Sequence, residues 1–147
     1  MQIRLKVLDS AKDLELPHYA TNGSAGVDLR ASISSDVVIN PSNRCLIQTG
    51  IQIALPDGYE AQIRPRSGLA LNYGVTVLNT PGTVDSDYRG ELKVLLMNLG
   101  AEPFTVTRGM RIAQLVISKF EKAEWVVVNS LDETNRGFGG YGSTGEK

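Results

Sequence analysis

The sequence predicts an all-β fold, either a sandwich or a barrel, and three observations predict it. Hydrophobic and polar residues alternate in several short segments, as they do in strands with one buried face. Turn-forming residues separate these segments at short intervals, and a single short segment has the pattern of a helix. Strands with this spacing are typical of β-sandwiches and barrels. With 147 residues, the chain is long enough for one domain with a hydrophobic core.

Six segments are expected to be strands. A period of two is clear in the first three, whereas the fourth is hydrophobic at nearly every position after Lys93, as in a strand buried on both faces. Turn signals such as NPSN at 40, PDG at 56 and NTPG at 79 lie between the segments. The expected strands span residues 3–7, 51–55, 59–63, 93–98, 111–120 and 124–130.

The only expected helix spans residues 67–74, with Ser67 as its N-cap and Gly74 as its C-terminal glycine. Arg64 and Arg66 come just before it. A helix N-terminus presents unpaired N–H groups and partial positive charge, so an added guanidinium and hydroxyl would form a site suited to phosphate. The alternative interpretation is a capped helix with two solvated arginines.

The segment 79–91, NTPGTVDSDYRGE, brings carboxylates close together. Pro81 and Gly82 indicate a hairpin turn, and Asp85 and Asp87 point to the same side if the following strand is regular. Such carboxylates can hold Mg²⁺ or orient a water for attack. On this segment alone, a strand edge protected by charge is the preferred interpretation, because that arrangement is common.

Three other polar residues stand out. Asp28, in SAGVDLRA, is expected to form a turn. Gln114 interrupts a hydrophobic strand and needs a hydrogen-bond partner if it faces inward. His18 is the only histidine and has no metal-ligand residue at a suitable spacing, so no role is assigned to it.

Composition excludes several classes of function. The net charge is −1 and the basic residues are scattered, which argues against a general nucleic-acid or membrane-surface binder. Cys45 is the only cysteine, so a disulfide framework and a cysteine-based metal site are excluded, and its side chain is expected to be buried. The first residues lack the apolar core of a signal peptide, and no apolar run is long enough to cross a bilayer. A cytoplasmic protein is expected.

The C-terminal residues 136–147, RGFGGYGSTGEK, are expected to be flexible because their composition cannot bury enough apolar surface to fold. Their glycines let the backbone approach a ligand, and Arg136, Ser143 and Thr144 carry groups that bind phosphate. A plain flexible linker is the alternative. The expected division of the chain is residues 1–130 for the β-domain and 131–147 for the tail.

In this order, five segments resemble the five motifs of the trimeric all-β dUTPases (deoxyuridine 5′-triphosphate nucleotidohydrolases), over nearly the whole chain. The resemblance implies a dUTPase-like β-barrel or jelly roll with one short helix and a flexible glycine-rich C-terminal tail. It implies hydrolysis of dUTP to dUMP and pyrophosphate by attack of water on the α-phosphorus, which keeps uracil out of DNA and supplies dUMP for dTMP synthesis. The segments are AGVDL at 25–29, PRSGLA at 65–70, GTVDSDYRGE at 82–91, RIAQLVI at 111–117 and RGFGGYGSTG at 136–145.

The resemblance also implies roles for residues of the third motif and the turn before it. Asp85 matches the aspartate that orients and deprotonates the attacking water. Asn79 and the hairpin backbone at Thr83 and Val84 match the groups that read uracil and leave no room for a 5-methyl group. Tyr88 matches the ring that packs on the deoxyribose and leaves no space for a 2′-hydroxyl.

The remaining motifs resemble the part of the family's site that binds phosphate. Arg66, Ser67 and Gly68 match the phosphate-binding motif, and Gln114 matches a glutamine near the α-phosphate. Asp28 matches the carboxylate that holds Mg²⁺ through bound waters. Mg²⁺ is therefore the implied cofactor.

In the tail, Arg136 matches the arginine that reaches the γ-phosphate, with Ser143 and Thr144 beside it. Tyr141 stands where the family usually has a phenylalanine that stacks on the uracil; a phenol stacks about as well, so the role is expected to survive. Phe138 receives no role. The implied assembly is a homotrimer with sites shared between subunits, and neither nucleic acid nor membrane is an expected partner.

Two other functions are compatible with parts of this pattern. A dCTP deaminase shares the fold and the triphosphate, but it needs a buried glutamate near Leu95, and VLLMN contains none. A catalytically inactive trimeric scaffold that binds dUTP or a regulatory partner is the second. Such a scaffold has no physical reason to keep both Asp85 and a complete tail, so hydrolysis is preferred.

Overall fold

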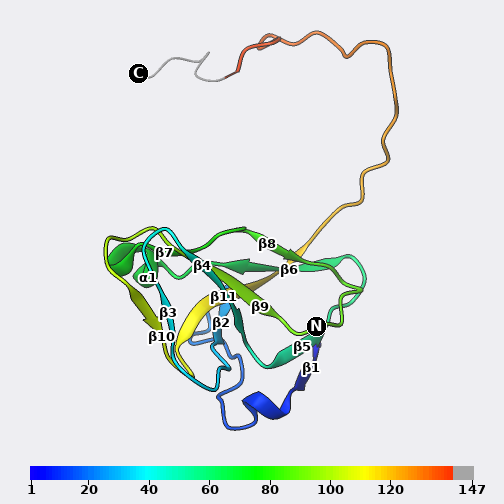
Figure 1. Ribbon diagram of the computed structural model, residues 1–147. Coiled ribbons are helices and arrows are strands. Elements are labelled where there is room, and N and C mark those ends of the chain that lie inside the picture. The colour runs from blue at the N-terminus through cyan, green and yellow to red at the C-terminus, as the bar shows by residue number, and fades with distance from the viewer. Residues whose placement is uncertain (141–147) are drawn as a thin grey trace.

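The computed structural model describes residues 1–140 and confirms the all-β prediction (Figure 1). Five of the six expected strands are present, and residues 1–140 contain six further strands that are not among the six expected segments. The elements are β1 (Arg4–Val7), a 3₁₀ turn (Asp9–Ala11), β2 (Gly26–Arg30), β3 (Val37–Ile39), β4 (Arg44–Gln48), β5 (Ile51–Ala54), β6 (Tyr59–Arg64), α1 (Ser67–Tyr73), β7 (Val75–Val77), β8 (Gly82–Val84), β9 (Lys93–Asn98), β10 (Phe104–Val106) and β11 (Arg111–Lys119).

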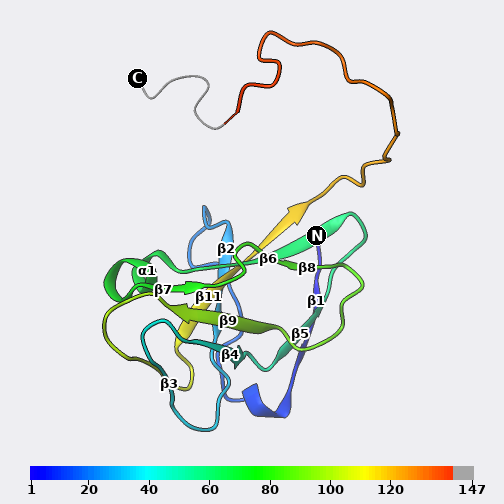
Figure 2. The same cartoon turned by 45° about the horizontal axis from the view of Figure 1, so that its top comes forward.

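The longest strand, β11, lies at the centre of the largest sheet. It pairs antiparallel with β2 on one side and with β6 on the other, and β8 extends the sheet beyond β6 to give the order β2-β11-β6-β8. A second sheet has the order β4-β9-β7, and the pairs β1-β5 and β3-β10 complete the barrel. In Figure 2, β11 crosses the body of the protein and leads directly into the C-terminal segment.

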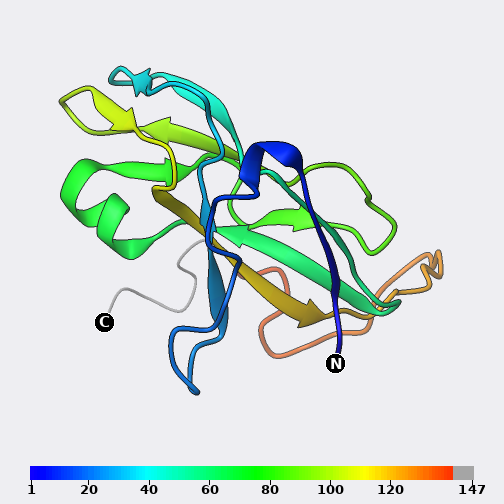
Figure 3. The same cartoon turned by 90° about the horizontal axis from the view of Figure 1, so that it is seen from below.

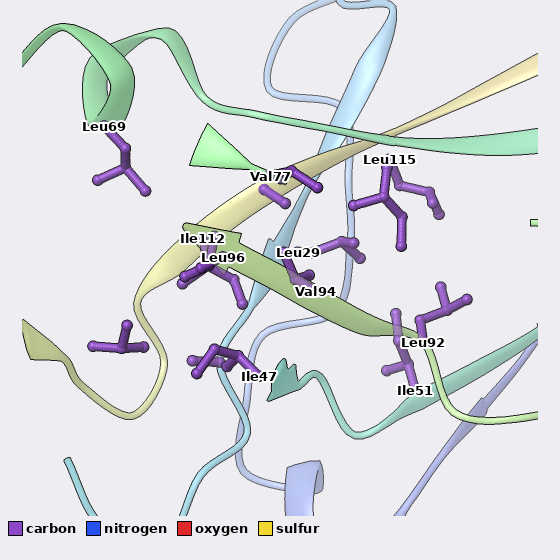
Figure 4. Packing of buried hydrophobic residues seen from close by; sticks show 14 of the residues in the cluster. Leu29, Ile47, Ile51, Leu69, Val77, Leu92, Val94, Leu96, Ile112 and Leu115 are labelled. Carbon is purple, nitrogen blue, oxygen red and sulfur yellow. The ribbon is translucent and has the colours of Figure 1, made fainter. Parts of the chain in front are cut away.

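The hydrophobic core lies between these sheets. Leu29, Ile112 and Leu115 from β2 and β11 point toward Val94 and Leu96 from β9 (Figure 4), and all five are buried. Burying an aliphatic side chain of this size contributes about 1.5–3 kcal/mol. Because a register shift of one residue would turn these side chains to solvent, the core fixes which residues of β2, β11 and β6 face outward.

The expected helix is present, but its N-cap prediction is wrong. Arg66 is the N-cap, with an extended backbone (φ −93°, ψ 128°), and Ser67 is the first helical residue. The expected C-terminal glycine is confirmed, since Gly74 has φ 67° and its N–H bonds to the carbonyl oxygens of Leu69 and Ala70. Figure 3 shows α1 at one end of the barrel, next to β7. In the part of the chain that the structure describes, no helix has the length and apolarity needed to span a membrane.

The strand expected at residues 124–130 is absent, so this prediction is wrong. The last strand ends at Lys119, and the backbone of Phe120 makes a final bond to the carbonyl of Gly58. Beyond it the chain runs away from the barrel (Figure 1) and leaves Trp125 88% exposed and Val127 96% exposed. A strand-like sequence forms no strand without a neighbour to pair with, and residues 1–140 of one chain provide none here.

Candidate active site

A cavity of about 520 Å³ opens beside β8 and the loop that follows it; we call it the β8 pocket. It brings together five residues predicted to act on one ligand: Asn79, Thr83, Val84, Asp85 and Tyr88. The rest of its wall comes from β4, β6, the first residue of β8, the loop after β8 and the start of β9. These wall residues are Leu46, Ile63, Gly82, Gly90, Glu91, Leu92 and Lys93.

The turn between β7 and β8 places Asn79 at the pocket. The N–H of Leu78 donates to the carbonyl of Leu95, and the Thr80–Pro81 peptide bond is cis. A Cβ added to Gly82 would lie 3.0 Å from Nδ2 of Asn79. Glycine at this position therefore leaves the space into which the amide of Asn79 points.

Asp85 follows the last residue of β8 and is exposed at the pocket. Its carbonyl oxygen accepts a bond from the N–H of Tyr88 at 3.2 Å, which closes a turn. Asp87 lies inside this turn and not on a strand, so the regular strand that would turn both carboxylates to one side does not extend to them. Because β8 ends at Val84, Asp85 lies at the cavity, and it is the single aspartate among the lining residues.

Tyr88 is held at the pocket by contacts of its hydroxyl and backbone. The hydroxyl donates to the carbonyl oxygen of Glu91 at 3.1 Å. The guanidinium of Arg89 donates to the carbonyl oxygens of Ser86 and Tyr88 at 2.6 and 2.8 Å. These bonds stiffen the turn that carries the ring, whose residue remains 45% exposed and available to a ligand.

Several residues predicted to bind phosphate or Mg²⁺ form a second group on the outer face of the large sheet. Gln114 lies opposite Asp28 on β2 and opposite Arg64 on β6. Residues directly opposite one another in antiparallel strands point to the same side, so these three side chains form a row across three strands. Asp28 is thus a strand residue, and the turn predicted for it is wrong.

Two arginines bind the carboxylate of Asp28. Nε of Arg66 donates to Oδ1 at 2.9 Å, and an Nη of Arg111 donates to Oδ2 at 3.2 Å. Arg66 also approaches the carbonyl oxygen of Arg111 at 3.4 Å. We call Asp28, Arg66, Arg111 and Gln114 the outer-face cluster. Sequence reasoning missed Arg111, although it opens the RIAQLVI segment.

The other expected arginine does not join this cluster. The guanidinium of Arg64 donates to Oε1 of Gln62 at 2.6 and 3.0 Å, and Gln62 in turn donates to Glu60 at 2.6 Å. Ser67 and Gly68 lie exposed in the first turn of α1, directly after Arg66. Of the two arginines before the helix, Arg66 is therefore the one next to the expected phosphate-binding residues.

The β8 pocket and the outer-face cluster lie on different faces of the same sheet. The side chains of Ile63 and Val84, which line the pocket, point to the buried side, and of the lining residues of β8 only the exposed Thr83 faces the other way. Alternate strand residues point to opposite sides, so Arg64 and Gln114 face the other way. No residue of the outer-face cluster lines the pocket. A single chain therefore presents two separate groups of predicted site residues.

The tail is described only in part. Within the described residues, the backbone bonds beyond Phe120 join tail residues to one another, in a turn around Gly137. Nε of Arg136 donates to the carbonyl of Gly139 at 2.9 Å, and Phe138 is fully exposed. The remaining residues with predicted roles, Tyr141, Ser143 and Thr144, lie outside the described residues.

Comparisons with known proteins agree with one another. The family model described as dUTPase matches residues 12–145. The chain is similar to the deoxyuridine 5′-triphosphate nucleotidohydrolases of Anaplasma marginale, with 54% identity over 99% of both chains, and of Caldanaerobacter subterraneus subsp. tengcongensis, with 57% identity over 97% of both. Its fold is similar to a dUTPase of Staphylococcus bacteriophage 80alpha solved with dUpNHpp (TM-score 0.87, 23% identity, 98% of both chains).

Proposed function

The chain belongs to the dUTPase family and hydrolyses dUTP to dUMP and pyrophosphate, and we propose that the β8 pocket binds the nucleoside while the outer-face cluster binds the triphosphate. The observation that carries this proposal is the pocket itself. A cavity of about 520 Å³ gathers an amide, a hairpin backbone, a carboxylate and an aromatic ring from residues 79–88.

Asp85 is proposed as the general base. An aspartate carboxylate within reach of a bound water can accept a proton from it. It is a weak base, but reactions at phosphorus depend mainly on positioning and on stabilisation of charge. The turn closed by the Tyr88 N–H holds Asp85 at the pocket, where it can orient a water toward the α-phosphorus.

The walls of the β8 pocket explain the proposed choice of nucleoside. The amide of Asn79 can pair with the edge of uracil, and the short strand at Thr83 and Val84 lies against the ring and leaves no room for a 5-methyl group. Tyr88 packs against the deoxyribose and excludes a 2′-hydroxyl. Base and sugar are thus selected by shape as well as by hydrogen bonds. Discrimination against other nucleotides is strong because they would leave polar groups of the pocket unpaired.

The outer-face cluster is proposed to bind phosphate. Arg66 supplies charge, Ser67 a hydroxyl and Gly68 a backbone N–H, and Gln114 lies near the α-phosphate. Arg136, Ser143 and Thr144 of the tail are proposed to reach the γ-phosphate, and Tyr141 is proposed to stack on the uracil. Charge-assisted bonds from arginine to phosphate oxygen are the strong interactions in such a site.

Mg²⁺ is proposed as the cofactor, held by Asp28 through water. Within residues 1–140, no group of three or more His, Cys, Asp or Glu side chains could bind a metal directly. Asp28 uses one position on each carboxylate oxygen for Arg66 and Arg111, which leaves lone pairs for metal-bound water. A single carboxylate that accepts bonds from metal-bound water fits Mg²⁺, because this ion keeps several waters and binds mainly to substrate phosphates. When bound, Mg²⁺ would neutralise charge on the triphosphate.

We propose a homotrimer in which each site combines the β8 pocket of one chain with the outer-face cluster of another. The two groups share no residue and lie mainly on opposite faces of one sheet, and a site between two chains would bring both groups to one ligand. The exposed residues Trp125, Val126, Val127 and Val128 provide an apolar surface for such contacts. Neither nucleic acid nor membrane is a proposed partner.

A panel of nucleotides tests the proposed specificity. We expect Mg²⁺-dependent release of pyrophosphate from dUTP, with turnover of dCTP, dTTP and UTP lower by at least about a hundredfold. Equal turnover of dTTP, or release of ammonia from dCTP, would contradict the proposal. A cytoplasmic location is proposed with it, because the substrate belongs to the nucleotide pool used for DNA synthesis.

Mixing two variants, each with a defect in one half of the site, tests the shared site. Asp85→Asn damages the β8 pocket, and Arg66→Gln damages the outer-face cluster. Unfolding and refolding the two variants together should restore part of the wild-type activity, because some mixed trimers contain a site built from two intact halves. Refolding each variant alone is the control. Failure of the mixture to exceed both controls would show that each site comes from one chain.

A further inference from the structure

Tyr88 lies unusually close to a glycine two residues further along the chain. A Cβ added to Gly90 would lie 2.2 Å from the hydroxyl oxygen of Tyr88, 2.4 Å from Cζ and 2.9 Å from Cε2. Real Cβ atoms do not approach other atoms so closely, and any side chain at position 90 would displace the ring. Both residues line the β8 pocket, so the displacement would occur inside the proposed nucleoside site.

The backbone conformation does not explain this glycine. Gly90 is not among the glycines with a φ in the left-handed region, which are Gly50, Gly58, Gly74, Gly109 and Gly137. An alanine could therefore adopt its backbone angles without strain. The three atoms nearest to such a Cβ all belong to the side chain of Tyr88.

The backbone after Gly90 is held more firmly than the ring. Oε1 of Glu91 accepts the N–H of Gly50 at 2.8 Å, and the hydroxyl of Thr49 donates to the carbonyl of Leu92 at 2.5 Å. The N–H of Leu92 donates to the carbonyl of Ile51 at 2.8 Å. The ring of Tyr88, in contrast, is the far end of a side chain and makes a single hydroxyl bond, to Glu91. A clash would thus move the ring and leave the backbone in place.

We propose that Gly90 is a positioning residue that sets the orientation of the Tyr88 ring and thereby the selection of deoxyribose over ribose. Without a Cβ at position 90, the ring lies against the backbone and its hydroxyl reaches the Glu91 carbonyl. With a Cβ there, the ring turns into the cavity or toward solvent, and the surface that faces the sugar is lost. The inference rests on the proposed role of Tyr88.

The test compares three variants: Gly90→Ala, Tyr88→Ala and the double variant. We expect Gly90→Ala to lower the ratio of kcat/KM for dUTP to that for UTP by about tenfold, mainly through KM for dUTP, with a melting temperature near that of the wild type. In the Tyr88→Ala background, Gly90→Ala should change this ratio by less than about twofold, because the clashing ring is gone. Gly23→Ala is the control, since a Cβ there meets nothing within 4 Å, and it should match the wild type.

The outcomes separate this inference from the function on which it rests. Equal turnover of dUTP and UTP by the wild type would overturn both. Wild-type selectivity in Gly90→Ala, or an equal effect of Gly90→Ala with and without the Tyr88 ring, would overturn the inference alone. If Gly90→Ala does not fold, recovery of folding in the double variant supports the proposed clash, and failure of both variants to fold overturns it.

Discussion

The β8 pocket and the outer-face cluster are built from opposite faces of one sheet, and they hold their functional groups in different ways. The pocket depends on turns, with a glycine beside Asn79 and a tyrosine bonded to the backbone of its own loop. The cluster depends on strand register, which places Asp28 opposite Gln114. The pocket therefore uses irregular backbone, whereas the cluster combines strand register with Arg66, the N-cap residue of α1.

The charges of the cluster have little to do with stability. Arg66 and Asp28 each keep about a quarter of their side-chain surface exposed (24%), and ion pairs with this access to water typically contribute about 0–1 kcal/mol. Two arginines and one carboxylate leave the cluster with a net positive charge. An anionic ligand balances that charge, which supports the proposed binding of triphosphate.

The largest expected effect comes from the single carboxylate of the pocket. Asp85→Asn should lower kcat for dUTP by about a thousandfold or more, because the amide cannot accept a proton from water. Binding of a non-hydrolysable dUTP analogue should remain measurable by calorimetry, since the phosphate-binding residues are unchanged. A variant with near-normal kcat would show that Asp85 is not the base and would remove the chemical distinction between pocket and cluster.

Removal of the tail should affect both regions at once. A chain that ends at Ser130 loses Arg136 and Tyr141, one proposed for the phosphates and the other for the base. We expect kcat/KM to fall by about a hundredfold, while circular dichroism and the melting temperature stay close to those of the full chain. Unchanged activity would mean that the pocket and the cluster suffice without the tail, and the proposed division at residues 130 and 131 would lose its functional meaning.

A pair of arginine variants tests the cluster by itself. Arg66→Gln should lower kcat/KM for dUTP by about ten- to a hundredfold, because a charge-assisted bond to phosphate is lost. Arg64→Gln is the matched control, since Arg64 is bonded to Gln62, and should change kcat/KM by less than about threefold. Steady-state kinetics at constant ionic strength makes the comparison. Equal losses in both variants would show that general positive charge, and not the cluster geometry, governs binding.

The smallest effect is expected far from both regions. The Arg108 guanidinium, which donates to both carboxylate oxygens of Asp13, holds the pKa of that carboxyl below its ordinary value. A depressed pKa in the folded state contributes stability above the unfolded pKa of about 3.9, and this contribution is lost as the pH falls through the folded pKa. Asp13→Asn should therefore weaken the fall in the free energy of unfolding below about pH 4 and leave dUTP turnover unchanged. Denaturation with urea between pH 3 and 6 measures the difference, and a steeper fall would contradict it.

Sequence patterns predicted the fold class, five strands, the helix and its terminal glycine. They failed where the structure depends on distant partners. Residues 124–130 have the composition of a strand but no strand neighbour among residues 1–140 of one chain. Arg66, with its extended backbone, takes the cap position expected for Ser67. The resemblance to known motifs supplied the site residues, yet no spacing along the chain could reveal that Arg111 binds Asp28, 83 residues away in sequence.

The exposed position of Trp125 has a practical consequence for spectroscopy. It is the only tryptophan in the chain, and it lies in the C-terminal segment at 88% exposure. Intrinsic fluorescence excited at the indole band therefore reports on this segment and not on the barrel. An indole in water emits at longer wavelength than a buried one, so a blue shift with rising protein concentration would follow subunit assembly without any added label.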